Sequence, residues 1–539
     1  MIFYRNFEKN GVDGIDKKHR PHKLSGNYKD NWEAHIKPDL LIIWFEVTEK
    51  YEISCCVQVR IHIYFKIIEN SCINLHICTT AYQHIKNMRV HFIAIGGSAM
   101  HNLAIALHKK GFEVSGSDDV LFEPSVSRLG KYRILPEKEG WYPEKITSKL
   151  DAVILGMHAR IDNAELLKAQ ELGIKVYSYP EYIYEQSKDK LRVVIGGSHG
   201  KTTITSMILH VLQAAGKDFD YLVGAQLAGF ETMVRLTHEA PVIVIEGDEY
   251  LASPIDRRPK FHLYKANIGV ISGIAWDHIN VFPTFDNYIE QFKLFIETIQ
   301  PGGQLIYCET DPVLNKMVTT DSSQIKKLPY LLPQYAIENG ITTVIYGSEK
   351  YPLEVFGEHN LLNMEAARLV CESLGIAQHD FYSYITTFKG AARRLELLGK
   401  NDSSNIFKDF AHSPSKLKAT VHAVRTQFPG RKLIACIELH TFSSLNKDFL
   451  AEYAGTMDEA DSAIVFIDKK TFEQKKMEPY PSEVVKKAFL KNDLLFFNEP
   501  ETLLKYLESI KIEGSNLLLM SSGNFGGINL IAISNKLLE

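Results

Sequence analysis

The segment with the clearest potential for chemistry is a glycine-rich loop that ends in a lysine and two hydroxyls. Glycines let backbone N–H groups turn toward a phosphate, and a helix N-terminus adds partial positive charge. A lysine in such a loop reaches the terminal phosphates of a nucleotide, and the next hydroxyl can hold Mg²⁺. Ile195 stands where the Walker pattern has its first glycine, so the loop is a shortened variant. It lies between a strand-like and a helix-like run and reads Gly197-Ser198-His199-Gly200-Lys201-Thr202-Thr203.

Acidic and imidazole groups follow the next two strand-like runs. Glu246 and Asp248 come after the apolar run 241–245, and the pair Asp277-His278 follows the run 268–272. The carboxyl ends of parallel strands form the edge at which such sheets bind ligands, and carboxylate oxygens suit Mg²⁺. The alternatives are a solvated acidic loop and a structural Asp-His pair, and the position at strand ends favours ligand binding.

Polar residues in the last third of the chain form three further motifs. Asn360 and Asn363 stand at a helix-like run, and they are followed by Arg393-Arg394 and by the Asp-x-Ala-His-x-Pro segment 409–414. The asparagines could cap the helix or offer amides to an adenine edge. Each motif is a weak signal by itself, whereas their order and spacing together are a strong one.

The elements that position these residues alternate between strands and helices from Met88 onward. Runs of β-branched and apolar residues are separated by runs with apolar groups at helical spacing. This alternation predicts parallel sheets with helices on both faces. Helices are predicted at 99–110, 163–172 and 285–299 and from about Thr202; strands are predicted at 89–95, 112–117, 152–155, 175–177, 192–195, 241–245, 268–272, 304–308, 405–410, 431–437, 462–466 and 516–520.

We therefore expect an α/β fold with three domains in series. They are a Rossmann-like N-terminal domain at 88–190, a P-loop central ATPase domain at 191–352 and an α/β C-terminal domain at 353–539. Residues 1–87 differ from the rest, because they hold four of the seven cysteines and carry no recognisable motif. Alternation between Val57 and Ile67 predicts one strand there. We expect 1–87 to be a dispensable extension, the alternative being a small accessory domain.

Composition narrows the class of protein further. The chain has 539 residues, 45% of them hydrophobic, and a net charge of −4, so it is globular and has no basic excess for nucleic acid. It lacks an apolar run near the ~18–20 residues of a membrane span, which excludes membrane insertion. Cysteines without metal-type spacing fit a reducing compartment, and we expect a cytoplasmic protein.

The ordered motifs from Met88 to the C-terminus resemble those of the Mur ligases, the ATP-dependent amide-forming enzymes of peptidoglycan synthesis. The resemblance implies that ATP phosphorylates a carboxylate and that an amine attacks the acyl phosphate. It implies ATP and Mg²⁺ as cofactors, Lys201, Glu246 and His278 as catalytic residues, and Thr202, Glu246 and His278 as metal ligands. The ATP-binding residues that it implies are Gly197, Ser198, His199, Gly200, Lys201, Thr202, Thr203, Asn360, Asn363, Arg394 and Asp409.

The segment Gly96-Gly97-Ser98-Ala99-Met100, followed by Gly116-Ser117-Asp118, is similar to that of the Mur ligases that accept unsubstituted UDP-N-acetylmuramate. The stretches 246–250, 256–261, 277–282 and 520–527 look more like the branch that adds the tripeptide L-Ala-γ-D-Glu-meso-diaminopimelate during murein recycling. This resemblance implies a tripeptide ligase, and the L-alanine ligases are the alternative. The family's carbamylated lysine cannot be placed, because Phe292 falls at its position. The substrate-binding residues implied are Gly96, Gly97, Ser98, Asp118, His412 and His440.

Two other classes of protein are alternatives to a ligase. The turn at Gly96-Gly97 with Asp118 some twenty residues on could belong to a dinucleotide-binding dehydrogenase, but Gly-Gly-Ser-Ala-Met lacks the Gly-x-Gly-x-x-Gly spacing. A non-catalytic nucleotide-sugar-binding relative is the other class, and the presence of every predicted ATP and metal group speaks against it.

Overall fold

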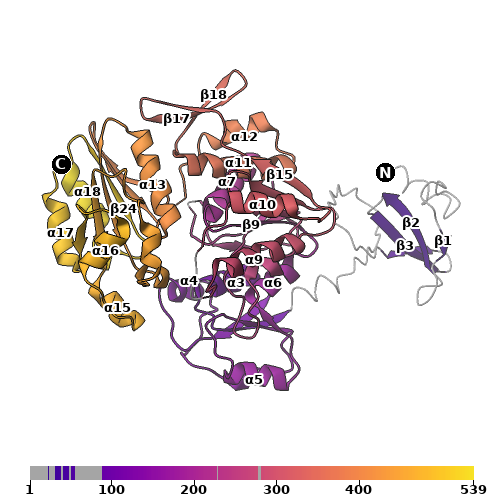
Figure 1. The fold of residues 1–539 in the computed structure, drawn as a ribbon. Coiled ribbons are helices and arrows are strands. Elements are labelled where there is room, and N and C mark those ends of the chain that lie inside the picture. The colour runs from indigo at the N-terminus through magenta and orange to yellow at the C-terminus, as the bar shows by residue number, and fades with distance from the viewer. Residues whose placement is uncertain are drawn as a thin grey trace.

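The computed structural model describes residues 22–23, 31–37, 40–47, 50–54, 88–227, 229–276, 281–391 and 393–539. From residue 88 on, mixed α/β domains follow one another, and the C-terminal domain lies beside the central one (Figure 1). The predicted three-domain α/β fold is confirmed. No helix within these described ranges is long and apolar enough to span a membrane.

The N-terminal domain is a parallel sheet in the order β6-β5-β7-β8. Its predicted strands and helices are confirmed. The central strand β5 is almost wholly buried, as expected for a strand covered on both faces. Its elements are β5 (Arg89–Ile93), α3 (Ser98–Lys109), β6 (Glu113–Ser117), α4 (Ser125–Lys131), β7 (Ala152–Leu155), α5 (Ala164–Glu171), β8 (Val176–Ser178) and α6 (Tyr179–Ser187).

The central domain is built on a seven-stranded sheet in the order β11-β10-β12-β9-β13-β14-β15, in which only β10 and β11 pair antiparallel. The strand β9 lies in the middle, so the loop after it emerges between two neighbouring strand ends. The elements are β9 (Leu191–Gly196), α7 (Lys201–Ala214), β10 (Asp220–Leu222), β11 (Val234–Arg235), β12 (Val242–Glu246), α8 (Lys260–Leu263), β13 (Ile268–Ile271), α9 (Phe285–Glu297), β14 (Gln304–Cys308), α10 (Pro312–Thr320) and β15 (Lys326–Tyr330).

A small antiparallel sheet and two helices follow the seven-stranded sheet. The sheet comprises β16 (Tyr335–Glu338), β17 (Ile341–Tyr346) and β18 (Glu349–Leu353). The helices α11 (Glu358–Ser373) and α12 (Gln378–Ile385) pack against α7. The predicted boundary at 352 assigned these helices to the C-terminal domain, but their apolar faces share the hydrophobic core of the central domain. The next core begins at Leu395.

The C-terminal domain has a six-stranded sheet in the order β19-β20-β24-β21-β22-β23, parallel except for the β19–β20 pair. The four strands predicted here are confirmed. Its elements are β19 (Glu396–Lys400), β20 (Asn405–Asp409), α13 (Pro414–Gln427), β21 (Lys432–Glu438), α14 (Phe442–Leu445), η5 (Phe449–Tyr453), β22 (Ser462–Phe466), α15 (Lys469–Lys475), α16 (Ser482–Phe489), β23 (Leu495–Phe497), α17 (Pro500–Ser509), β24 (Ser515–Met520), η6 (Phe525–Gly527) and α18 (Leu530–Leu538).

The segment before Met88 contains an antiparallel sheet in the order β1-β2-β3-β4. The strands are β1 (His22–Lys23), β2 (Asn31–Lys37), β3 (Leu40–Val47) and β4 (Lys50–Ser54). The strand predicted over 57–67 lies outside the described residues.

Candidate active site

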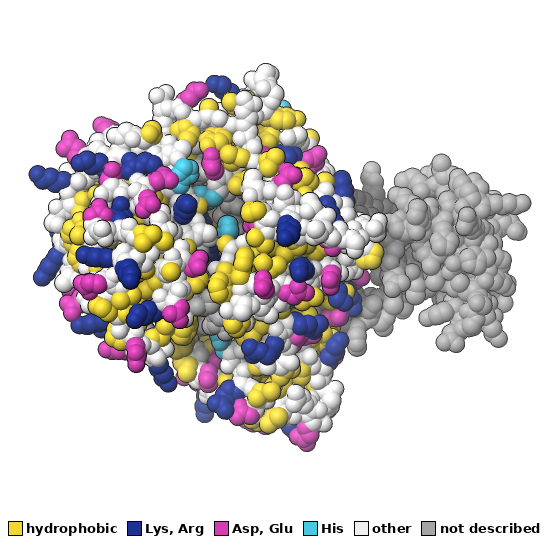
Figure 2. Space-filling view, in the orientation of Figure 1, with side chains coloured by type: hydrophobic (Ala, Val, Ile, Leu, Met, Phe, Trp, Pro, Cys, Tyr) yellow, Lys and Arg dark blue, Asp and Glu magenta, His cyan; other side chains and the backbone are white. Residues whose placement is uncertain are grey.

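A cavity of about 560 Å³ lies between the central and C-terminal domains. Its walls come from the loop after β9, the carboxyl ends of β12, β13 and β14, helix α11 and the first loops and helix of the C-terminal domain. The space-filling view is hollowed along this domain boundary, and histidine side chains gather there (Figure 2). A volume of this size suits a nucleotide-sized ligand. The predicted residues that it gathers are Ser198, His199, Gly200, Lys201, Thr202, Thr203, Glu246, Asn360, Asn363, Arg394, Asp409 and His412.

Two glycines shape the loop that forms the floor of this cavity. Gly197 has φ +123° and Gly200 has φ +80°, both in the region that favours glycine. A Cβ at Gly197 would collide with Ser272 Oγ, and a Cβ at Gly200 would collide with Asn363 Oδ1. Gly200 is the N-cap of α7, so the helix N-terminus opens on the cavity. The first N–H groups of α7 and the helix dipole thus point toward the cavity, which is an anion-binding arrangement.

Lys201 lies in this loop and is held by two acceptors. Its Nζ donates to the backbone oxygen of Gly197 at 2.6 Å and to Glu249 Oε2 at 2.7 Å. The Lys201 side chain is 16% exposed and that of Glu249 is 1% exposed. Burial acts to lower the pKa of Lys201, but the charges of Glu249 and Asp248 outweigh it, and the pKa is raised. The ammonium is therefore charged at neutral pH and available to a phosphate.

Thr202 and Glu246 form an oxygen-rich corner beside the lysine. Thr202 Oγ1 donates to Glu246 Oε1 at 2.8 Å, and the N–H of Gly224 donates to Glu246 Oε2 at 2.7 Å. Burial raises the pKa of Glu246. Hydroxyl and carboxylate oxygens at a phosphate loop are donors that suit Mg²⁺. His278 lies outside the described residues, among which no cluster of three or more His, Cys, Asp or Glu side chains could hold a metal ion.

Helix α11 and the C-terminal domain carry the remaining predicted residues of the cavity. The N-cap of α11 is Gly357, with no side-chain cap, so neither Asn360 nor Asn363 caps this helix; Asn360 Nδ2 donates to the backbone oxygen of Phe356 at 2.8 Å. The capping alternative is therefore wrong. Asn363 instead faces the phosphate loop, at Gly200.

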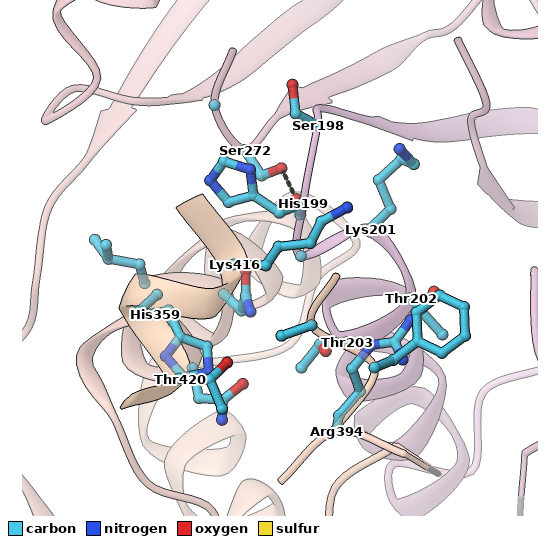
Figure 3. A pocket seen from close by; sticks show the side chains of 18 of the residues that line it. Ser198, His199, Lys201, Thr202, Thr203, Ser272, His359, Arg394, Lys416 and Thr420 are labelled. Atoms are coloured by element: carbon cyan, nitrogen blue, oxygen red, sulfur yellow. Dashed lines mark hydrogen bonds between the residues drawn. The ribbon is translucent and has the colours of Figure 1, made fainter. Parts of the chain in front are cut away.

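Arg394 and Asp409 approach the loop from the C-terminal domain. The Arg394 guanidinium lies 4.6 Å from the centre of the Phe410 ring, on the side of Thr202 and Thr203 in Figure 3. Burial lowers the pKa of Arg394, against the charge of Asp409. Burial also raises the pKa of Asp409, which accepts N–H bonds from Leu395 at 2.7 Å and from Ala411 at 2.6 Å. Backbone donors thus fix this carboxylate at the edge of the cavity.

The predicted substrate residues fall in different places. His412 lines the cavity, and its Nδ1 lies 2.8 Å from the backbone oxygen of Phe410. His440 lies next to the cavity-lining Thr441; its buried Nδ1 has no hydrogen-bond partner in the described part of the chain.

The four predicted residues of the N-terminal domain lie outside this cavity, at the carboxyl ends of β5 and β6. The N–H of Gly96 donates to Asp118 Oδ2 at 2.6 Å, and burial raises the pKa of Asp118 to about 6. Gly97 is the N-cap of α3, and Ser98 is its first residue. This second place is a strand-end loop of the kind that binds ligands in α/β domains.

Sequence reasoning missed several residues that line the cavity. Glu249 belongs to the same acidic stretch as Glu246, and nothing in the sequence says which of them faces the lysine. Asp311 follows β14, a third strand end, and its Oδ2 accepts the N–H of Ile274 at 2.6 Å. Lys416 and Thr420 stand four residues apart on α13, and His359, whose pKa burial lowers to about 4, is the second residue of α11 (Figure 3). Helical spacing on α13 was the one available signal for that pair.

Family models match most of the chain. Residues 195–371 match the Mur ligase middle domain, 89–190 the catalytic domain of the Mur ligase family and 393–523 the Mur ligase glutamate ligase domain. Residues 7–62 match YafQ, a bacterial toxin of type II toxin-antitoxin systems. The segment before Met88 thus has a family match of its own.

Curated relatives align along nearly their whole length. A UDP-N-acetylmuramate–L-alanine ligase from Clostridium kluyveri is 30% identical over 466 residues, which cover 82% of this chain and 97% of the relative. One from Caldanaerobacter subterraneus is also 30% identical, over 84% of this chain and 98% of the relative.

Solved structures share the fold. A murein peptide ligase from Psychrobacter arcticus has 22% identity and a TM-score of 0.56, with 84% of this chain and 98% of that one covered. The UDP-N-acetylmuramate-alanine ligase from Thermotoga maritima has 19% identity and a TM-score of 0.59, with the same coverage of 84% and 98%.

Proposed function

Because the chain belongs to the Mur ligase family of ATP-dependent, ADP-forming amide ligases, we propose that it joins UDP-N-acetylmuramate to the tripeptide L-Ala-γ-D-Glu-meso-diaminopimelate. The observation that carries the proposal is the cavity in which Lys201, Glu246 and Asn363 of the central domain meet Arg394 and Asp409 of the C-terminal domain. Such a cavity can hold ATP between two domains while an acceptor carboxylate enters beside the terminal phosphate.

The first step overcomes the low reactivity of a carboxylate. A lactyl carboxylate oxygen of the muramate attacks the γ-phosphorus of ATP, the bond to the β–γ bridging oxygen breaks, and ADP and an acyl phosphate result. Phosphoryl transfer depends on positioning and on neutralising charge. The N–H groups of the 197–203 loop would hold the phosphates, Lys201 would contact the β- and γ-phosphates, and Arg394 would reach ATP from the other side.

Thr202 and Glu246 would hold Mg²⁺, and His278, which lies outside the described residues, is the third expected ligand. Bound there, the ion would neutralise phosphate charge. The hydrogen bond from Thr202 and the N–H of Gly224 keep the Glu246 carboxylate oriented toward the loop.

The second step forms the amide. The amine nitrogen attacks the acyl carbon, the bond from that carbon to the phosphate oxygen breaks, inorganic phosphate leaves, and the nitrogen loses a proton. The amine would arrive along the C-terminal wall, where His412, Thr441 and Ser522 line the cavity. The rings of Trp276 and Phe449 lie 6.2 Å apart across the domain boundary, a contact that supports a closed, water-poor site.

UDP-N-acetylmuramate would bind at the loop of Gly96, Gly97 and Ser98, with Asp118 beside it. This loop is tied to the central domain, because Asn102 Oδ1 on α3 accepts the N–H of Met233 at 2.9 Å. The link supports a path for the sugar acid from the N-terminal domain toward the cavity.

Two amines are in competition for the second substrate. The resemblance of the stretches 246–250, 256–261, 277–282 and 520–527 favours the tripeptide. The second candidate is L-alanine, favoured by the names of the relatives at 30% identity.

A substrate panel separates the candidates. Purified protein is supplied with ATP, Mg²⁺ and UDP-N-acetylmuramate, and ADP release is measured with the tripeptide, with L-alanine and with neither. We expect release with the tripeptide that requires the sugar nucleotide. Release with L-alanine alone would replace the proposal by the second candidate, and sugar-independent or absent release would refute ligase activity.

A further inference from the structure

A buried tyrosine connects the two ends of the phosphate loop. Tyr288 on α9 places its Oη 2.9 Å from Ser198 Oγ and 3.1 Å from Glu249 Oε1. Tyr288 is fully buried, and Glu249 is 1% exposed. Ser198 stands early in the loop and Lys201 three residues later (Figure 3), and the Tyr288 hydroxyl contacts the first directly and the second through Glu249.

The hydrogen-bond donors give this connection a direction. A carboxylate paired with an ammonium only accepts, so Tyr288 donates to Glu249. A phenol has a single proton, and the bond between Ser198 and Tyr288 must therefore be donated by Ser198. Ser198 Oγ in turn accepts the N–H of Ala275 at 2.8 Å. A directed chain thus runs from Ala275 through Ser198, Tyr288 and Glu249 and meets Lys201.

We propose that Tyr288 is a positioning residue for ATP, which acts by fixing Glu249 and, through it, Lys201. The proposal rests on the proposed function, in which Lys201 contacts the terminal phosphates. It adds a residue of α9 that lies outside the cavity lining and outside the predicted motifs.

The orientation of Glu249 matters because the ammonium group of Lys201 has a limited number of protons to donate. An ammonium has three protons, and two of those of Lys201 go to Gly197 and to Glu249 Oε2. The third remains for a phosphate. Tyr288 holds Oε1 of Glu249 and thereby keeps this carboxylate on the lysine through one oxygen. Without the phenol proton, Oε1 loses this donor, the Glu249 carboxylate is held less firmly on Lys201, and it competes with ATP for the protons of the ammonium.

A purely structural role for Tyr288 predicts a different outcome. Its ring centre lies 5.4 Å from that of Phe282 and 5.2 Å from that of Phe292, in an aromatic cluster beneath the loop. Phenylalanine keeps these ring contacts and removes only the hydroxyl. Under a structural role, Tyr288→Phe lowers thermal stability and leaves ATP affinity unchanged.

The chain offers a matched control. Tyr382 on α12 is buried and donates to the buried carboxylate of Glu365 at 2.7 Å, away from the cavity lining. Tyr382→Phe therefore removes the same kind of bond from the same hydrophobic core. We expect Tyr288→Phe to raise the ATP dissociation constant and the KM for ATP about tenfold, the effect of one lost bond to a charged group, with kcat within about threefold. Tyr382→Phe should leave all three constants unchanged.

The measurements are calorimetric binding of ATP, steady-state ADP release and the thermal midpoint of each variant. An unchanged ATP affinity in folded Tyr288→Phe overturns the inference while the proposed function stands. Weakened binding in a protein that does not ligate sustains the inference and refutes the function. A wild-type protein that binds no nucleotide refutes both.

A second pair of variants tests the chain at its preceding link, in case Tyr288→Phe does not fold. Ser198→Ala removes the hydroxyl that donates to Tyr288 and should weaken ATP binding, whereas Ser198→Thr keeps a hydroxyl and should restore it. Equal affinities for the two variants contradict the directed chain. In a Glu249→Gln background, Tyr288→Phe should add little to the loss, because the two changes act through one contact; full additivity also overturns the proposal.

Discussion

Replacing Lys201 by methionine should cost stability as well as activity, because the lysine neutralises a carboxylate that has almost no access to water. The Glu249 side chain is 1% exposed, and Lys201 Nζ lies 2.7 Å from it. Removing one partner of a buried ion pair costs about 3–5 kcal/mol, since the remaining charge is uncompensated. Lys201 is itself 16% exposed, so we expect the lower end, about 3 kcal/mol. Methionine is similar in length, which keeps the packing loss small.

The double variant Lys201→Met with Glu249→Gln separates the two effects. Glutamine carries no charge, and its amide oxygen can accept the Tyr288 hydroxyl as Glu249 does. We therefore expect the double variant to recover about 2 kcal/mol of the lost stability, a clear departure from additivity. ADP release should stay at background in both variants, because neither has the loop ammonium that would contact the β- and γ-phosphates.

Urea unfolding measures the free energy of unfolding of each variant, and a coupled enzyme assay measures ADP release. A lower transition midpoint with an unchanged slope for Lys201→Met reports a loss of stability alone. If the single variant unfolds at the wild-type midpoint, or if the double variant is less stable than the single one, Lys201 does not neutralise Glu249 in the folded protein. Retained ADP release in either variant would contradict the role assigned to the lysine.

Three further predictions concern the ATP site, the expected metal ligand His278 and the acidic stretch that follows β12. Arg394→Gln should raise the KM for ATP about tenfold with little change in thermal midpoint, and an unchanged KM would remove this residue from the ATP site. His278→Ala should impair turnover and shift the Mg²⁺ dependence of ADP release, whereas an unchanged Mg²⁺ titration would exclude it as a ligand. Burial acts to raise the pKa of Asp248, but the charge of Lys260, whose Nζ lies 2.6 Å from Asp248 Oδ2, prevails and lowers this pKa from 3.8 to about 2. The ion pair therefore stabilises the fold above pH 3.8, and its contribution to the free energy of unfolding is lost as pH falls toward 2. Lys260→Met should therefore lower the thermal midpoint near pH 7, and the gap to wild type should narrow below pH 4; a gap constant with pH would contradict it.

Local structure was the part that could be predicted from the residues. Strand β9, for example, is a run of β-branched and apolar residues, of which Val193, Val194 and Ile195 are wholly buried. The phosphate loop was also recognisable, because positive φ angles at Gly197 and Gly200 require the residue type that the sequence shows there. Such features depend on backbone geometry and side-chain periodicity within a few residues.

The domain boundary was not predictable from these local signals. The loop-rich segment 320–352, with its short strands, suggested a break near 352, yet Leu361, Met364 and Val370 of α11 are wholly buried in the central core. Helical periodicity says that a helix has an apolar face and leaves open which sheet or helix covers it.

The amino-acid sequence by itself determined the alternation of strands and helices, the anion-binding loop and the kinds of side chain available to it. Only the tertiary structure decided which of two neighbouring glutamates meets Lys201, that Asn363 lies against the loop while Arg394 reaches it from the C-terminal domain, and that Tyr288 lies beneath it. The physical reason is range: glycine conformation and hydrophobic period act between near neighbours, whereas these contacts join residues far apart in the chain and form only when the packed domains bring them together.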